Sequence, residues 1–280
     1  MINKNYKLTK SNIPFPHIII ENFLDENFYN MLEQKFPGEQ KFKSIQNKVN
    51  RMNYDTTFGD KLYTELMNEN KEYNELHNFI YSNKFINYFL DLFNENISDE
   101  IKKNFMIHDV FKFEKHPDPY EINRIIDKKT HNKTNNIKIL YPRLDIGMGK
   151  KNYGIKTGGK GIHIDNPQRL ISILFYLGGY NSIDGGDHRI WKVKNDNELE
   201  ISKIIKPKRN LLIASLQNNI AFHDVYPIKK IDGSRNAFYI AISSSTKIWK
   251  DLKDININKK FNKNRYKKKS LIKKFLNFLN

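Results

Sequence analysis

The sequence predicts an α+β fold, in which helices are followed by an antiparallel β-sandwich or barrel. Apolar residues recur at helical spacing up to about residue 94, and from about 105 they fall in short or alternating runs separated by Gly, Asn and Asp. Hydrophobic residues form 39% of the 280 residues, enough apolar surface for a folded core. We therefore expect one domain over residues 1–249, with helical support at about 14–104 and a strand-rich core at about 105–246.

The N-terminal part is expected to form a strand and then helices. Pro16–Ile20 is an apolar run typical of a buried strand. Asp25 is a suitable N-cap for a helix over about 25–36, which Pro37-Gly38 would end. Two or three further helices are expected between about 60 and 94, where Leu and Phe form apolar stripes that predict core packing rather than a site.

The strand-rich core is expected to begin near residue 105. Two polar stretches, 114–136 and 148–161, interrupt it and predict long loops. In a jelly roll such loops rim the open end, where ligands enter. The candidate strands are 105–113, 137–147, 169–177, 187–193, 211–216, 219–225 and 236–243.

Composition excludes several kinds of site. The chain has no cysteine, which excludes disulfides, thiolate zinc sites and cysteine nucleophiles, so any metal must be bound by His, Asp or Glu. The N-terminus has no apolar signal segment, and no stretch approaches the roughly 20 apolar residues of a membrane span. We therefore expect a cytoplasmic protein.

The C-terminal segment 250–280 is strongly basic. It holds eleven Lys and Arg against Asp251 and Asp254, a net charge of +9, which leaves +8 of the total +17 for residues 1–249. Apolar residues around Lys273-Lys274 predict a short basic amphipathic helix as a C-terminal tail. This tail could rest on an anionic membrane, dock a partner or pack on the body. The moderately basic body gives little support for a nucleic-acid partner.

Three side chains could share one metal ion. His163 and Asp165 stand at i and i+2 beside a strand-like run, so their side chains would project from the same face of an extended backbone. His223, in an apolar run sixty residues later, could join them from another strand. Two histidines and one carboxylate are the ligands of non-haem Fe(II), although zinc hydrolases use the same types. A second His-x-Asp, His116-Pro117-Asp118, lies in a proline-containing polar loop and is discounted.

Arg235 predicts the cosubstrate. It lies twelve residues after His223, beyond a turn at Asp232-Gly233-Ser234, and it opens the apolar run Ala237–Ala241. Two adjoining antiparallel strands would bring its guanidinium near the metal, where it could bind a carboxylate by a planar, bidentate fork. We therefore expect Fe(II) to bind the 2-oxo acid end of 2-oxoglutarate and Arg235 to bind the distal carboxylate.

The order of these motifs resembles the 2-oxoglutarate/Fe(II) dioxygenases of the prolyl-4-hydroxylase-like group: His163-x-Asp165, then Gly185-Gly186-Asp187, His223 and Arg235. The opening PFPHIIIENFLDENFYNMLEQKFP is similar to the lead-in strand and helix of bacterial members. The resemblance implies a double-stranded β-helix (jelly-roll) core with N-terminal flanking helices. It also implies that these three ligands bind iron, that Gly185-Gly186-Asp187 is a hairpin entering a middle strand, and that O2 is used to hydroxylate an unactivated C–H bond with release of succinate and CO2.

The resemblance covers about residues 137–245 directly, with some departures. Many members place a hydroxyl residue two positions after the arginine, where this chain has Ala237. The second partner of the 2-oxoglutarate carboxylate is therefore open, with Tyr141 and Ser172 as candidates. Nucleic-acid demethylases of this superfamily carry another arginine where Ala241 stands, which argues against a nucleic-acid substrate.

Other polar and aromatic side chains are expected to be structural. Arg169 could face the site and meet an anionic substrate, but we favour a surface ion pair. Trp191 and Tyr176 are expected to fill the sandwich, and Asp224 to point away from the site. The remaining histidines lack a carboxylate in a strand context and are assigned structural or surface roles: His17, His77, His108, His116, His131 and His188.

Two other functions stay open at this point. A non-catalytic jelly-roll module could bind nucleic acid or an anionic glycan, and its affinity would then fall steeply with salt and disappear without residues 250–280. A cupin-like zinc or iron enzyme without 2-oxoglutarate would require Arg235 to face away from the metal. In an oxygenase, the loops 114–136 and 148–161 would set specificity, and their Lys and Asn content favours a polar or anionic small molecule, glycan or protein.

Overall fold

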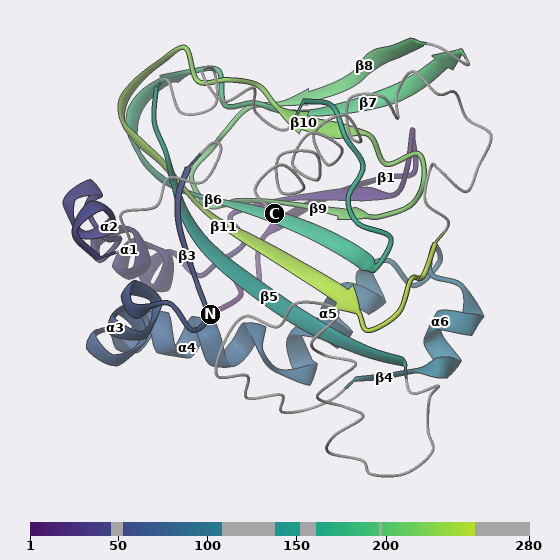
Figure 1. The fold of residues 1–280 in the computed structure, drawn as a ribbon, viewed down its shortest axis with the longest axis horizontal. Helices are drawn as coiled ribbons and strands as arrows, with labels where there is room; N and C mark the ends of the chain where they lie inside the picture. The colour runs from purple at the N-terminus through teal and green to yellow at the C-terminus, as the bar shows by residue number, and fades with distance from the viewer. Residues whose placement is uncertain (46–52, 108–137, 152–160, 196–197, 250–280) are drawn as a thin grey trace, which may run out of the picture.

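The computed structural model describes residues 1–45, 53–107, 138–151, 161–195 and 198–249. Two sheets, almost entirely antiparallel, form its core, and the smaller lies over one face of the larger (Figure 1). The strands are β1 (Lys7–Ser11), β2 (His17–Glu21), β3 (Asn53–Thr57), β4 (Phe105–Ile107), β5 (Lys138–Gly149), β6 (Arg169–Asp184), β7 (His188–Asn195), β8 (Glu198–Ile205), β9 (Leu211–Leu216), β10 (His223–Val225) and β11 (Lys230–Ser244).

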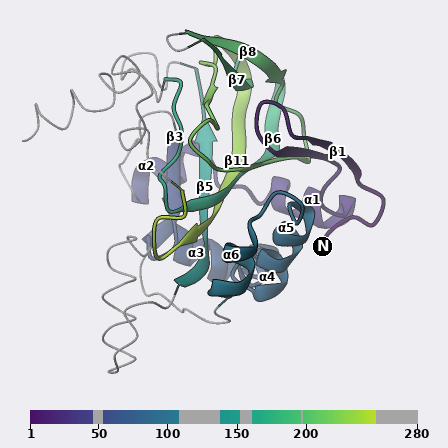
Figure 2. The same cartoon turned by 90° about the vertical axis from the view of Figure 1, so that its right-hand side faces the viewer.

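The strand order accounts for the position of the site. The larger sheet runs β1-β2-β9-β6-β11-β5-β3, with β4 beside β5 in parallel, and the smaller runs β10-β7-β8. Strands β6 and β11 lie side by side at the middle of the larger sheet, and β10 and β7 lie above them in the view of Figure 1. Figure 2 shows the small sheet, with β7 and β8, at the top of the molecule from the side. This arrangement is consistent with a jelly-roll core.

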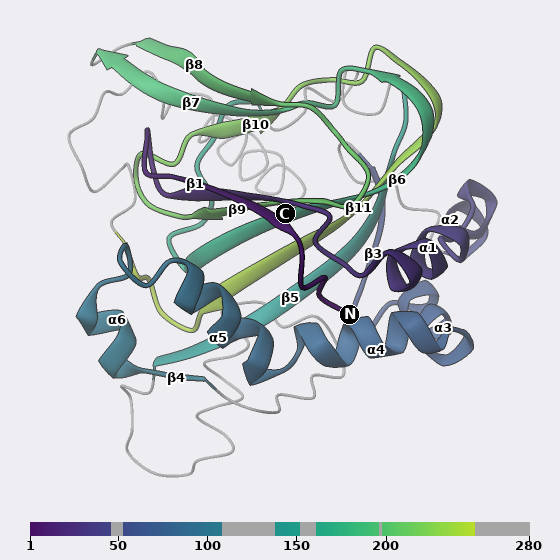
Figure 3. The same ribbon diagram turned by 180° about the vertical axis from the view of Figure 1, so that it is seen from behind.

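Helices cover the other face of the larger sheet, away from the small sheet (Figure 3). Asp25 caps the first of them, because its carboxylate accepts from the backbone N–H groups of Asn27 and Phe28 at 3.1 and 3.3 Å. None of the helices in the described ranges is both long and apolar enough to cross a membrane. The helices are α1 (Glu26–Gln34), α2 (Glu39–Ile45), α3 (Lys61–Glu69), α4 (Lys71–Ile80), α5 (Asn83–Leu92) and α6 (Asp99–Asn104).

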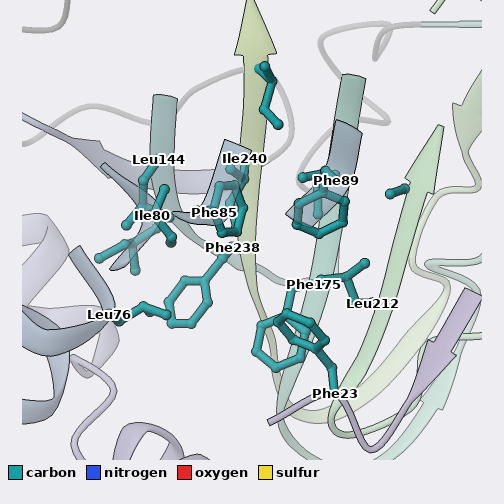
Figure 4. Packing of buried hydrophobic residues seen from close by; sticks show 14 of the residues in the cluster. Phe23, Leu76, Ile80, Phe85, Phe89, Leu144, Phe175, Leu212, Phe238 and Ile240 are labelled. Carbon is teal, nitrogen blue, oxygen red and sulfur yellow. The ribbon is translucent and has the colours of Figure 1, made fainter. Parts of the chain in front are cut away.

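The two faces of β6 differ because its side chains alternate. Ile173 and Phe175 belong to the large apolar core between sheet and helices, whereas Ser172 and Leu174 face the small sheet. Burial of such apolar area at roughly 25 cal/mol per Å² holds the helices on the sheet. Figure 4 shows part of this core: Phe23, Leu76, Ile80, Phe85, Phe89, Leu144, Phe175, Leu212, Phe238 and Ile240.

Strands β1, β3 and β8 are not predicted from the sequence. Strands β1 and β8 lie at sheet edges and carry many exposed polar side chains, so they lack the apolar run that predicts a buried strand. The strand expected at 219–225 is reduced to β10, and residues 148–149, expected in a loop, extend β5. The predicted loop 114–136, most of the loop 148–161, the second His-x-Asp and the tail 250–280 lie outside the described residues.

Candidate metal centre

His163, Asp165 and His223 lie together between the two sheets. His163 and His223 face each other in an isolated antiparallel bridge, in which the N–H of each donates to the carbonyl of the other at 3.0 and 2.9 Å. Asp165 follows His163 at i+2. One nitrogen or oxygen atom from each of the three side chains lies within 4.8 Å of the others. The backbone pairing therefore brings three possible metal ligands to one point.

Backbone hydrogen bonds fix how the two imidazoles are turned. Nδ1 of His163 lies 2.9 Å from the carbonyl oxygen of Gly161, and Nδ1 of His223 lies 3.0 Å from that of Ala221. A carbonyl oxygen can only accept, so each Nδ1 carries the hydrogen and each Nε2 carries the lone pair. The Nε2 atoms lie 3.9 and 3.8 Å from the carboxylate oxygens of Asp165. Metal-binding histidines are commonly oriented in this way.

Asp165 is 6% exposed and is held by two donors. Ser172 donates its hydroxyl hydrogen to Oδ2, and Nη1 of Arg169 lies 3.1 Å from Oδ1. A buried carboxylate needs such partners, because burial without them is costly. The surface ion pair favoured for Arg169 is thus wrong: the residue lines the site and pairs with one of its candidate ligands.

Arg235 is buried on the cavity face of β11. From Arg235 to Ser244, strand β11 pairs with β5 without a break in register. Arg235 and Tyr239 are four residues apart, so their side chains project from the same face of β11. Its Nη1 donates to the carbonyl of Gly186 at 3.0 Å, and its Nη2 donates to the hydroxyl of Tyr239 at 2.9 Å. Burial works to lower the pKa of Arg235, but the phenol oxygens of Tyr239 and Tyr176 outweigh it, so the pKa lies above its ordinary value.

Among the described residues, no carboxylate forms an ion pair with Arg235. The side chain is 2% exposed, its Nε has no hydrogen-bond partner, and no carboxylate of the described residues lies within ion-pair distance. A buried guanidinium without an anion is costly. A carboxylate supplied by another molecule could balance this charge.

Two glycines set the turn that holds Arg235. Gly185 and Gly186 have φ angles of 88° and 75°, which L side chains rarely adopt. A Cβ on Gly185 would lie 2.2 Å from the carbonyl oxygen of Pro227. This turn aims the carbonyl of Gly186 at Arg235 and at the hydroxyl of Tyr176, which donates to it at 3.2 Å.

A cavity of about 270 Å³ lies against the three candidate ligands, between the sheets. Its lining also includes charged side chains from β3 and β5, Asp55, Arg143 and Asp145, of which Arg143 donates from Nε to Asp145 at 2.9 Å. The cavity therefore has room for a small molecule beside the candidate ligands and offers it charged groups.

The two residues expected to bind the 2-oxoglutarate carboxylate together with Arg235, Tyr141 and Ser172, do not lie beside Arg235. Tyr141 is opposite Ser243 on β11, eight residues from Arg235, or about 26 Å at ~3.3 Å per residue, so it cannot share a carboxylate with Arg235. Ser172 bonds Asp165 instead. Tyr239, whose hydroxyl accepts from Nη2 of Arg235, is instead the neighbouring hydroxyl, and it could have been found by continuing the strand alternation from Ala237 to the next residue on that face.

His188 also lines the cavity, although the sequence pattern assigns it a structural or surface role. The sequence feature that could have identified His188 as a cavity residue is its position at the start of a strand, directly after Gly185-Gly186-Asp187. Asp224 is structural as expected: it is buried, and accepts from Nε of Arg189 at 2.8 Å and from Nε1 of Trp191 at 3.0 Å.

Comparison by sequence finds no matching family model and no matching curated protein. Comparison by structure finds prolyl 4-hydroxylases and other 2OG-Fe(II) oxygenases, the group that the motif order resembles. A prolyl 4-hydroxylase of Phytophthora capsici is 12% identical with a TM-score of 0.45, over 81% of this chain but only 58% of that chain.

Two further solved structures are similar over 81% of this chain. A prolyl hydroxylase of Trichoplax adhaerens, in complex with a hypoxia inducible factor oxygen degradation domain peptide, is 16% identical over 83% of its length with a TM-score of 0.40. A viral collagen prolyl hydroxylase of Paramecium bursaria Chlorella virus-1, in complex with 2OG, is 14% identical over 94% of its length with a TM-score of 0.37.

Proposed function

We propose that this protein is an Fe(II)- and 2-oxoglutarate-dependent oxygenase that hydroxylates a C–H bond of a polar substrate and releases succinate and CO2. The observation that carries the proposal is the buried guanidinium of Arg235, which forms no ion pair with a described carboxylate. It projects from the same face of β11 as Tyr239, which lines the cavity together with the His-Asp-His cluster. A zinc hydrolase could use the same three ligands. It would have no need of a buried site for a carboxylate.

Each residue has a role in this proposal. His163, Asp165 and His223 hold the iron, which when bound supplies the activation of O2. Ser172 and Arg169 keep Asp165 in place. Arg235 and Tyr239 bind the distal carboxylate of 2-oxoglutarate and so fix the direction in which the cosubstrate lies.

The cavity wall supports a polar substrate. Asp55, Arg143 and Asp145 bring both signs of charge to the cavity that the proposed iron ligands line, so a substrate that enters there can form hydrogen bonds and ion pairs. We propose a polar or anionic small molecule, glycan or protein side chain as the substrate.

The test is succinate formation from 2-oxoglutarate, with Fe(II), O2 and 2-oxoglutarate each omitted in turn. The wild-type protein should form succinate only when all three are present, and His163→Ala should abolish it. His116→Ala, in the other His-x-Asp sequence, is a matched control that should retain turnover. Full turnover by His163→Ala, or turnover without added 2-oxoglutarate, would refute the proposal.

A further inference from the structure

His188 lines the same cavity as the proposed iron ligands. It is the first residue of β7, its ring centroid is 5.6 Å from that of His223, and it lines the cavity. Arg235 donates to the carbonyl of Gly186, two residues before His188. His188 is therefore close to both ends of the proposed cosubstrate site.

The imidazole of His188 has no hydrogen-bond partner in the described structure. It is 7% exposed, and neither Nδ1 nor Nε2 has a hydrogen bond. His77, in the helix layer, shows the usual arrangement, because its Nδ1 lies 2.8 Å from the hydroxyl of Tyr63. A buried polar group without a partner lowers stability, so its presence in a cavity indicates a ligand that completes it.

His188 offers a hydrogen-bond donor to the cavity. In either tautomer, one of the two ring nitrogens of a neutral imidazole carries a hydrogen. A hydrogen bond from this N–H would suit a carboxylate or keto oxygen without adding a second charge beside Arg235.

We propose that His188 donates a hydrogen bond to the bound 2-oxoglutarate and is, with Arg235, one of the groups that select this cosubstrate. This inference rests on the proposed function and adds a binding residue to it. Two other roles are possible for a histidine here: a fourth metal ligand, or a side chain that only fills space. Each gives a different result on substitution.

The experiment measures binding rather than turnover. Calorimetric titrations without O2 would give the affinity for Mn(II) alone and then the affinity of the Mn(II)-loaded protein for 2-oxoglutarate. His188→Leu should weaken 2-oxoglutarate about tenfold or more, the loss expected for a hydrogen bond to a charged ligand. It should leave Mn(II) affinity within about twofold, since no metal ligand is removed. His188→Gln, which keeps an N–H donor, should recover part of the affinity.

The melting temperature provides a second readout, because substitutions of His188 and His77 should change it in opposite directions. His188→Leu should raise the melting temperature of the ligand-free protein, because it removes an unpaired polar group. The matched control His77→Leu should lower it, because it leaves Tyr63 without its partner, and should leave 2-oxoglutarate affinity unchanged.

The outcomes separate this inference from the proposed function. Unchanged 2-oxoglutarate affinity in His188→Leu would show that the ring only fills space, and an equal loss of Mn(II) affinity would show a metal ligand; either overturns the inference while the proposed function stands. If the wild-type Mn(II)-loaded protein bound no 2-oxoglutarate, the proposed function would fall, and the role of His188 with it.

Discussion

The two faces of the large sheet are built differently. On the helix face, side chains such as Phe175 and Phe238 are apolar, fully buried and packed against one another and the helices. On the side of the cavity, Nε of Arg235 on β11 has no hydrogen-bond partner, and neither has the imidazole of His188, which faces the cavity from β7 of the small sheet. The helix face stabilises the fold, whereas the cavity face gives up stability to keep groups ready for a ligand. Substitutions on the two faces should therefore have opposite consequences.

The largest loss of stability is expected on the helix face. Phe238→Ala should lower the free energy of unfolding by about 3–5 kcal/mol, because Phe238 is fully buried and its removal leaves a cavity beside Phe175 and Tyr73. Denaturant unfolding monitored by circular dichroism measures this loss. A change below about 1 kcal/mol would mean that the helices do not depend on this packing.

On the cavity face, Arg235→Met should instead weaken ligand binding without lowering stability. Affinity of the Mn(II)-loaded protein for 2-oxoglutarate should fall by about 100-fold, in line with the roughly 2–5 kcal/mol lost when one partner of a buried charge pair is removed. The unfolding free energy of the ligand-free protein should stay the same or rise, because an unpaired buried charge is replaced by an apolar side chain. Unchanged affinity would contradict the carboxylate site.

A smaller effect is expected where a side chain only positions a ligand. Ser172→Ala removes the hydroxyl that bonds Asp165, and should weaken Mn(II) binding about tenfold. Ser182→Ala, an exposed position on the same strand, is the control and should have no effect. Equal Mn(II) affinity in the two variants would show that Ser172 does not position the ligand.

The smallest effect is the pH dependence of stability on the helix side. Burial lowers the pKa of His77 below 6.5, so below that pH the unfolded chain binds a proton that the folded protein does not. Stability from this group is complete above pH 6.5 and is lost as pH falls. Urea unfolding without metal, at about pH 7.5 and about pH 5.5, measures how much the free energy of unfolding falls between the two pH values. This fall should be smaller for His77→Leu than for wild type. Equal falls would exclude His77 as a contributor to the pH dependence of stability.

The sequence predicts best those features that depend on strand alternation. His163 and Asp165 share a face because their spacing is two, and Arg235 lies one strand after His223. The relative positions of these side chains can be predicted from strand alternation alone, without knowing how the loops fold. The same alternation, followed further, leads from Arg235 to Tyr239.

Other contacts depend on distances that the sequence does not contain. Arg169 reaches Asp165 across a turn, and His188 enters the cavity because of the backbone angles at Gly185 and Gly186. Long side chains and positive φ angles decide these contacts, and neither follows from apolar periodicity.

The central claim is that one site binds Fe(II) and 2-oxoglutarate together. The most direct measurement is the visible absorption spectrum of the Fe(II)-loaded protein, titrated with 2-oxoglutarate in the absence of O2. We expect a charge-transfer absorption that grows to saturation at one equivalent in wild type and is absent in His163→Ala. No such absorption in wild type, or an equal one in His163→Ala, would contradict the claim.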